Sequence, residues 1–172
     1  MGLLDILNQY AHPTPATAAT SEAHFDEVAK EVPPDELGRG VAEAMRSDQT
    51  PPFSDMVGQM FGRSNPQQRA GMLNQILASL GPQVLSGLAG GVLGRVLGTG
   101  TASPAATRTQ VSPEEANQIT PEQMREIAAH AEQQNPNVVD KVGGFFGQHP
   151  DLVKGLGGMA LAVLLGKLAN KR

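Results

Sequence analysis

Residues 55–62 read DMVGQMFG and residues 140–147 read DKVGGFFG, so the pattern D-x-V-G-x-x-F-G occurs twice in the chain. In both copies the valine and the phenylalanine are four residues apart, as on one face of an α-helix. The two glycines are also four apart, and glycine lets another backbone approach closely. Each copy therefore predicts a short helix packed against a neighbour, with Phe61 and Phe146 as packing residues.

The similarity continues upstream of this motif, between residues 25–62 and residues 112–147. At a constant offset of 87, the matches are Glu27 with Glu114, Ala29 with Ala116, Val32 with Ile119, Pro34-Asp35 with Pro121-Glu122 and Leu37 with Met124. A two-residue contraction of the intervening loop then gives the offset of 85 at the motif. These matches predict an internal duplication. A chance match is the alternative, because proline followed by an acidic residue is common where helices start.

Helical signals dominate the surrounding sequence. We expect helices over residues 22–31, 34–46, 53–61 and 66–80, with Ser21 capping the first of them. No stretch shows the alternation of β-branched residues that indicates a strand. The predicted fold class is all-α, with two small helical-bundle units at residues 21–81 and 112–172.

The N-terminal residues 1–11 form an expected amphipathic helix. Its apolar side consists of Leu3, Leu4, Ile6 and Leu7. A helix this short is marginal in water, so we expect it to dock on another surface. Residues 12–20 read HPTPATAAT and are expected to be a flexible linker, because prolines interrupt helical hydrogen bonding.

Between the two expected units lies a glycine-rich apolar helix at residues 82–98. Gly87 and Gly91 are four apart, and so are Gly90, Gly94 and Gly98. Small residues at this spacing bring helices into close contact, particularly in lipid. We name these five glycines the glycine ladder and expect it to mediate packing or association. Residues 99–111 are expected to be a second flexible linker.

The C-terminal stretch 155–168 is apolar on nearly all sides, which is typical of a helix that is buried or lies at a membrane interface. Acidic residues are absent between Met56 and Pro113 and after Asp151, while basic residues occur in both regions. This distribution fits contact with anionic lipid, self-association, or burial inside a soluble fold. The apolar runs are shorter than a membrane-spanning helix requires, and we expect no cleavable signal peptide.

The composition excludes several kinds of chemistry. The net charge is −4, which argues against non-specific nucleic-acid binding, and the absence of cysteine excludes disulfides, Cys-ligated zinc and thiol nucleophiles. The four histidines show no metal-ligand spacing, and the sequence contains neither G-x-S-x-G nor a phosphate-binding loop. We therefore expect no catalytic, cofactor or metal site.

The opening MGLLD, together with P-E-Q-M at residues 121–124 and V-G-x-F-F-G at residues 142–147, resembles the YidB-like group of small bacterial proteins. The resemblance implies an all-α, bacterial, non-secreted protein, and it carries over no site residue because the group is functionally uncharacterised. The duplicated unit and the Pro/Thr-rich linkers depart from that group.

These features predict a non-enzymatic interaction or assembly protein. It would use its glycine-rich apolar helices for self-association or for peripheral membrane contact. The expected partners are a second copy, another protein or an anionic membrane surface, with no nucleic acid and no cofactor. The expected location is the cytoplasm, including the periphery of the inner membrane. The alternative is a soluble regulatory or binding module that holds a protein or a small apolar ligand between its two units.

Overall fold

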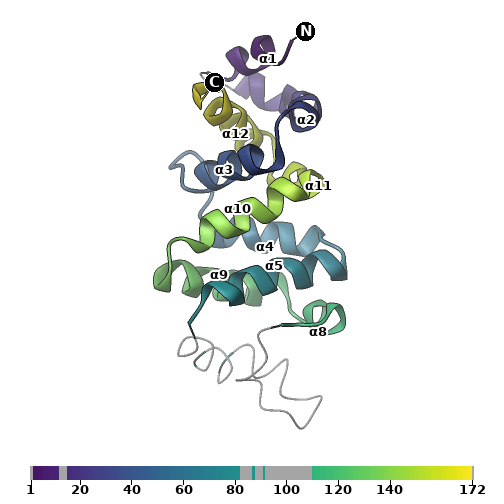
Figure 1. Cartoon of the computed structure of the whole chain (residues 1–172), viewed down its shortest axis with the longest axis vertical. Coiled ribbons are helices and arrows are strands. Elements are labelled where there is room, and N and C mark those ends of the chain that lie inside the picture. Colours follow the sequence, from purple (N-terminus) through teal and green to yellow (C-terminus); the bar gives the residue numbers. More distant parts are fainter. Residues whose placement is uncertain (1, 12–14, 82–86, 88–90, 92–109, 172) are drawn as a thin grey trace. The chain divides into compact units, whose positions relative to one another are not determined.

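The computed structural model describes residues 2–11, 15–81, 87, 91 and 110–171 (Figure 1). Every regular element in the longer described ranges is a helix, which confirms the all-α prediction. In chain order the elements are α1 (Leu3–Gln9), α2 (Pro15–Glu31), α3 (Pro34–Met45), α4 (Phe53–Arg63), α5 (Pro66–Ser79), α8 (Pro113–Asn117), α9 (Pro121–Gln134), α10 (Val138–Gln148), α11 (Pro150–Val153), the 3-10 turn η2 (Lys154–Leu156) and α12 (Gly158–Lys171).

The chain forms two compact units whose boundaries differ from those of the two sequence units. Unit 1 combines Met1–Pro52 with Val142–Arg172, and unit 2 is the continuous segment Phe53–Lys141. The expected unit at 21–81 is thus divided, because α2 and α3 belong to unit 1 while α4 and α5 belong to unit 2. The physical reason is packing: α3 is covered by α12, whereas α4 is covered by α9.

Helix α12 supplies the centre of unit 1. It packs against α1, α2 and α3. Its buried residues are Ala160, Leu161, Ala162, Val163, Leu164, Leu165, Gly166 and Leu168. Of the two environments expected for this apolar stretch, the structure shows burial within the unit.

Within the described ranges, no single helix is both long and apolar enough to cross a membrane. Only the segments Pro150–Leu156 and Gly158–Lys171 pass that test together, and they meet at a bend of 120°. The bend falls at Gly157, whose φ of 85° lies in the left-handed region that favours glycine.

The core of unit 2 lies between two pairs of helices. Helix α4 packs against α9, and α5 packs against α8 and α9 (Figure 1). The fully or almost fully buried side chains include Phe53, Val57, Met60, Phe61, Met72, Leu73, Ile76, Ile119, Met124, Ile127 and Ala128. Methionine, leucine and isoleucine fill most of this core, which explains how the unit folds with few aromatic residues.

Several helices start with the same local device. A side-chain cap is followed by proline at the first helical position, which suits a residue without an N–H group. In α5, α8 and α9 the cap is a reciprocal capping box, formed by Asn65 with Gln68, Ser112 with Glu115 and Thr120 with Gln123. These boxes satisfy backbone N–H groups that a helix start otherwise leaves unpaired.

Helix α2 differs from the sequence prediction at its N-terminal end. It begins at Pro15, so residues 15–20 are helical where a flexible linker was expected. Ser21 is therefore inside the helix and does not cap it. Its buried hydroxyl donates to the carbonyl oxygens of Ala18 (2.8 Å) and Gly158 (2.9 Å). The alanines of this stretch are strong helix formers, and packing against α12 adds the contacts that hold the first turns.

Candidate interaction surfaces

In unit 1, helices α3 and α10 cross at glycines and their backbones approach very closely. A Cβ atom on Gly143 would lie 2.7 Å from the carbonyl oxygen of Gly38 and 2.8 Å from the Cβ of Ala42. A Cβ atom on Gly147 would overlap the carbonyl oxygen of Pro34 and lie 2.7 Å from the nitrogen of Gly38. The glycines thus allow a contact that any side chain would prevent. Phe146, between them in sequence, is fully buried.

In unit 2, helices α4 and α9 cross in a similar way. A Cβ atom on Gly58 would overlap the aliphatic stem of Arg125 and lie 3.0 Å from the carbonyl oxygen of Pro121. A Cβ atom on Gly62 would lie 3.2 Å from Cγ of Pro121. Phe61 is fully buried at this crossing.

Neither Gly62 nor Gly147 ends its helix in a left-handed conformation. Gly62 lies within α4 and Gly147 lies within α10. Gly157 is the one glycine with positive φ among the residues that the structure describes. These glycines therefore allow the close approach of two helices, as the sequence predicted.

The glycine ladder is described only in part. Gly87 is exposed, and a Cβ atom built on it meets no described atom within 4 Å; Gly91 is partly exposed. Gly90, Gly94 and Gly98 lie outside the described residues, as do residues 99–109 of the expected second linker. The described chain resumes before Val111, whose backbone N–H and carbonyl both bond to the side chain of Asn74, at 2.7 and 3.1 Å.

The N-terminal helix α1 docks on α12 and α2 within unit 1. Of the four expected docking residues, Ile6 and Leu7 are buried, Leu3 is partly exposed and Leu4 is 62% exposed. The anchor that the sequence analysis missed is Tyr10. Its ring is fully buried and its hydroxyl is hydrogen-bonded to Nδ1 of His24 at 2.8 Å.

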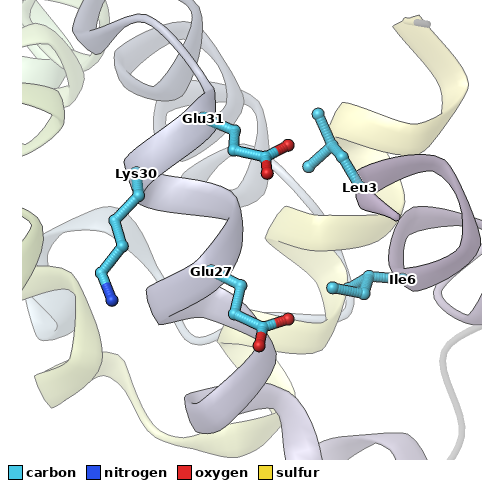
Figure 2. Close-up of a pocket in the computed structure, with 5 residues that line it drawn as sticks. All are labelled: Leu3, Ile6, Glu27, Lys30 and Glu31. Carbon is cyan, nitrogen blue, oxygen red and sulfur yellow. The ribbon is translucent and has the colours of Figure 1, made fainter. Parts of the chain in front are cut away.

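A recess of about 230 Å³ lies between α1 and α2. Figure 2 shows the carboxylates of Glu27 and Glu31 turned towards the side chains of Leu3 and Ile6, while the ammonium group of Lys30 points away. The recess therefore has an acidic wall on α2 and an aliphatic wall on α1. This combination suits a cation that carries an apolar group.

Two ion pairs connect helical elements of unit 1. In unit 1, Lys154 pairs with Asp26 at 2.5 Å and Lys171 pairs with Glu43 at 2.6 Å. The hydrogen bond to Asp26 raises the pKa of Lys154 above its ordinary value; desolvation opposes this rise, and the nearby carboxylates of Asp26, Asp151 and Glu22 add to it. Such partly exposed pairs contribute little to stability individually.

The described residues contain no group of three or more His, Asp or Glu side chains placed to hold a metal ion. Many polar side chains act in local structure instead. Arg69 illustrates this: its guanidinium lies 5.2 Å from the centre of the Phe61 ring, and it donates to the carbonyl oxygens of Phe61 and Gly62. These groups fix the end of α4 beside the start of α5.

The structure identifies anchors that the sequence analysis did not name. The capping boxes could have been found from N-P-Q-Q, S-P-E-E and T-P-E-Q, because each places Asn, Ser or Thr three residues before Gln or Glu. No short sequence pattern indicates the hydrogen bonds of Ser21, Asn74 and Tyr10. Each of these residues bonds to a residue of another segment, so only the tertiary fold brings the donor and the acceptor together.

The fold defines an all-α protein of two compact helical units whose helices cross at glycines. No family model, curated protein or solved structure matches the chain.

Proposed function

We propose that this chain is a non-enzymatic helical assembly protein that associates with further copies of itself. The observation that carries the proposal is the pairing of helices from different sequence segments in both units. Each unit joins a helix from the first of the two similar segments to a helix from the second, at a crossing formed by glycine. Both units therefore form by packing of helices from the first similar segment against helices from the second.

The two crossings use corresponding residues of the predicted duplication. Gly62 of α4 meets Pro121 of α9 in unit 2, and Gly147 of α10 meets Pro34 of α3 in unit 1. Gly147 corresponds to Gly62 at the offset of 85, and Pro121 corresponds to Pro34 at the offset of 87. A chance similarity would not favour corresponding contacts, so this agreement supports an internal duplication.

A second pair of contacts follows the same rule. Gly58 meets Arg125 in unit 2, and Gly143 meets Gly38 in unit 1. Gly143 corresponds to Gly58 at the offset of 85, and Arg125 corresponds to Gly38 at the offset of 87. We call α2–α3 and α8–α9 the front segments and α4–α5 and α10–α12 the back segments. Each unit then consists of the front segment of one repeat and the back segment of the other.

We propose that a second copy of the chain associates through the glycine ladder. It is apolar, it lies between the two repeats in the sequence, and the described Gly87 is exposed. Helices that contact each other through glycine gain van der Waals contact from close backbone approach. We therefore expect the glycine ladders of two copies to contact each other.

Light scattering of the whole chain over a range of concentrations tests this proposal. We expect the mass to rise above 18.0 kDa with concentration, and we expect Gly91→Leu with Gly94→Leu to reduce that rise. Leucines at Gly81 and Gly144 are the matched control, because a Cβ atom on either glycine meets nothing within 4 Å. A mass that stays at one chain at every concentration would contradict the proposal. Adding anionic vesicles to the same samples distinguishes self-association from peripheral membrane contact.

A binding module is the second candidate function, and the recess between α1 and α2 favours it. Its acidic and aliphatic walls would fit an alkylammonium group or a lysine side chain. Calorimetric titration with an alkylammonium ion tests this reading. Glu27→Gln with Glu31→Gln should abolish the heat of binding, whereas Glu22→Gln, which removes a charge from the same helix outside the recess, should preserve it. Equal heats from all variants would exclude this site.

A further inference from the structure

A second recess, of about 130 Å³, lies in unit 1 and shares no lining residue with the recess between α1 and α2. Its described wall combines three segments of the chain: Ala11 after α1, the loop between α3 and α4, and one face of α12. Ala11, Val163 and Gly166 form its apolar part, and the last two are buried. Because the three segments are far apart in the sequence, only the folded unit forms this recess.

Helix α12 supplies a cation to the recess. Its lining residues have the spacing of a single helix face, namely Val163, Gly166, Lys167 and Asn170. Lys171, one turn further along, is already paired with Glu43 at 2.6 Å. Lys167 has no ion pair or hydrogen bond with any residue that the structure describes. Its ammonium group is therefore available to a ligand.

The loop between α3 and α4 adds uncharged donors in a fixed position. The hydroxyl of Thr50 donates to the carbonyl oxygens of Ala44 at 2.6 Å and Ser47 at 2.9 Å, which holds the loop at the end of α3. The hydroxyl oxygen of Ser47 accepts from the backbone N–H of Gln49 at 3.3 Å, so the hydroxyl proton can be donated to a ligand. A site that is ordered before its ligand arrives loses less entropy on binding.

The polar side chains of the recess are donors without a carboxylate among them. Lys167 offers an ammonium group and Ser47 offers a hydroxyl. Gln49 and Asn170 offer amide NH₂ groups, and neither amide is hydrogen-bonded to a described residue. Asp48, in the same loop, is exposed and does not line the recess. Charged donors bind anionic oxygens more strongly than neutral donors do, so this set of groups favours an oxyanion.

We propose that this recess binds a phosphate group, held by the ammonium of Lys167 and by the uncharged donors around it. A phosphate presents its oxygens in a tetrahedral arrangement, so donors from α12 and from the loop can each reach one of them. A carboxylate has only two oxygens, which lie in one plane. Free inorganic phosphate and the head group of an anionic phospholipid share this chemistry. The site is independent of the self-association proposed above.

Nuclear magnetic resonance of the whole chain, titrated with inorganic phosphate at constant pH and ionic strength, tests the site. We expect saturable shifts of the side-chain amide signals of Gln49 and Asn170. Acetate at the same ionic strength should shift these signals less. If phosphate shifts neither signal, or if acetate shifts them equally, the assignment to phosphate is overturned.

Lys167→Gln should weaken phosphate binding about tenfold, because it removes a charge-assisted hydrogen bond. Asn170→Ala should weaken it about threefold, as expected for one neutral hydrogen bond. Both side chains are at least partly exposed, so we expect the fold to be retained, and circular dichroism checks this. The matched control is Lys141→Gln, which removes the same charge from an exposed position outside the recess. Equal phosphate affinities of Lys167→Gln and Lys141→Gln would exclude the recess as the site.

Vesicles of phosphatidylcholine with phosphatidic acid distinguish the two sources of the phosphate group. The unmodified chain, Lys167→Gln and Lys141→Gln are each sedimented with them. Loss of cosedimentation in Lys167→Gln alone would assign the site to a lipid head group. If no chain cosediments while the unmodified chain shows the phosphate-dependent shifts, the site takes a free phosphate. Equal cosedimentation of all three chains would exclude the recess as the point of lipid contact.

Discussion

Replacing Gly147 by alanine should destabilise unit 1, although alanine favours helices. The new Cβ atom would overlap the carbonyl oxygen of Pro34 and lie 2.7 Å from the nitrogen and 2.8 Å from the Cα of Gly38. These are backbone atoms of α3, so no side chain can rotate away and the two helices must separate.

The size of the effect follows from two opposing terms. Overpacking of a close contact typically costs about 1–3 kcal/mol, and the backbone partners place this site at the upper end. Alanine recovers up to about 1 kcal/mol through its helix propensity. We therefore expect a net loss of about 2 kcal/mol, which lowers the melting temperature of a chain of this size by about 4–8 °C.

Gly144 provides a control on the same helix. A Cβ atom there meets nothing within 4 Å. Gly144→Ala should therefore change stability only through the higher helix propensity of alanine, and it should leave the melting temperature unchanged or slightly raised. Thermal unfolding followed by circular dichroism measures both variants. If Gly147→Ala melts at or above the temperature of the unmodified chain, the close crossing of α3 and α10 is refuted.

Three further substitutions test single anchors. Ser21→Ala removes a buried hydroxyl that bonds to two carbonyl oxygens, and urea unfolding should show a loss of about 1–3 kcal/mol. Asn74→Ala removes both hydrogen bonds to Val111, so amide hydrogen exchange at Val111 should become faster, and unchanged exchange would contradict this anchor. The pair of Lys154 and Asp26 predicts a dependence on alkaline pH. Because the pKa of Lys154 is raised in the folded chain, its contribution is complete below the ordinary value of about 10.5 and is lost as the pH rises through the folded value. Melting temperatures measured between pH 9 and pH 11.5 should therefore fall less in Asp26→Asn than in the unmodified chain.

Local signals predicted most of the helices. The starts of α3 and α5 follow from Pro34 and Pro66, because proline fits the first turn of a helix and supplies no N–H group that would need a partner. The start of α2 was predicted too late, because prolines near residues 13–15 indicate a break, whereas Pro15 stands at the beginning of the helix. The same residue type that ends one helix can begin the next.

The candidate surfaces were predicted less completely. The V-G-x-x-F-G motif indicated close packing at Gly58, Gly62, Gly143 and Gly147, and the structure brings each of them against another helix. The sequence could not show which helix that would be. It also placed Leu4 with Ile6 and Leu7 on one apolar face, yet Leu4 is largely exposed because α1 is held mainly by Ile6, Leu7 and Tyr10.

The sequence by itself determined the helical class, the positions of several helix starts and the closely packed glycines of the V-G-x-x-F-G motif. Those properties depend on interactions within a few residues: hydrogen bonding at a cap, the fixed φ of proline and the spacing of apolar residues along one face. Only the tertiary structure decided that each of the two similar sequence segments is divided between two compact units and that α12 is buried in one of them. Pairing of distant helices depends on which surfaces cover one another most completely, and that is a property of the whole folded chain.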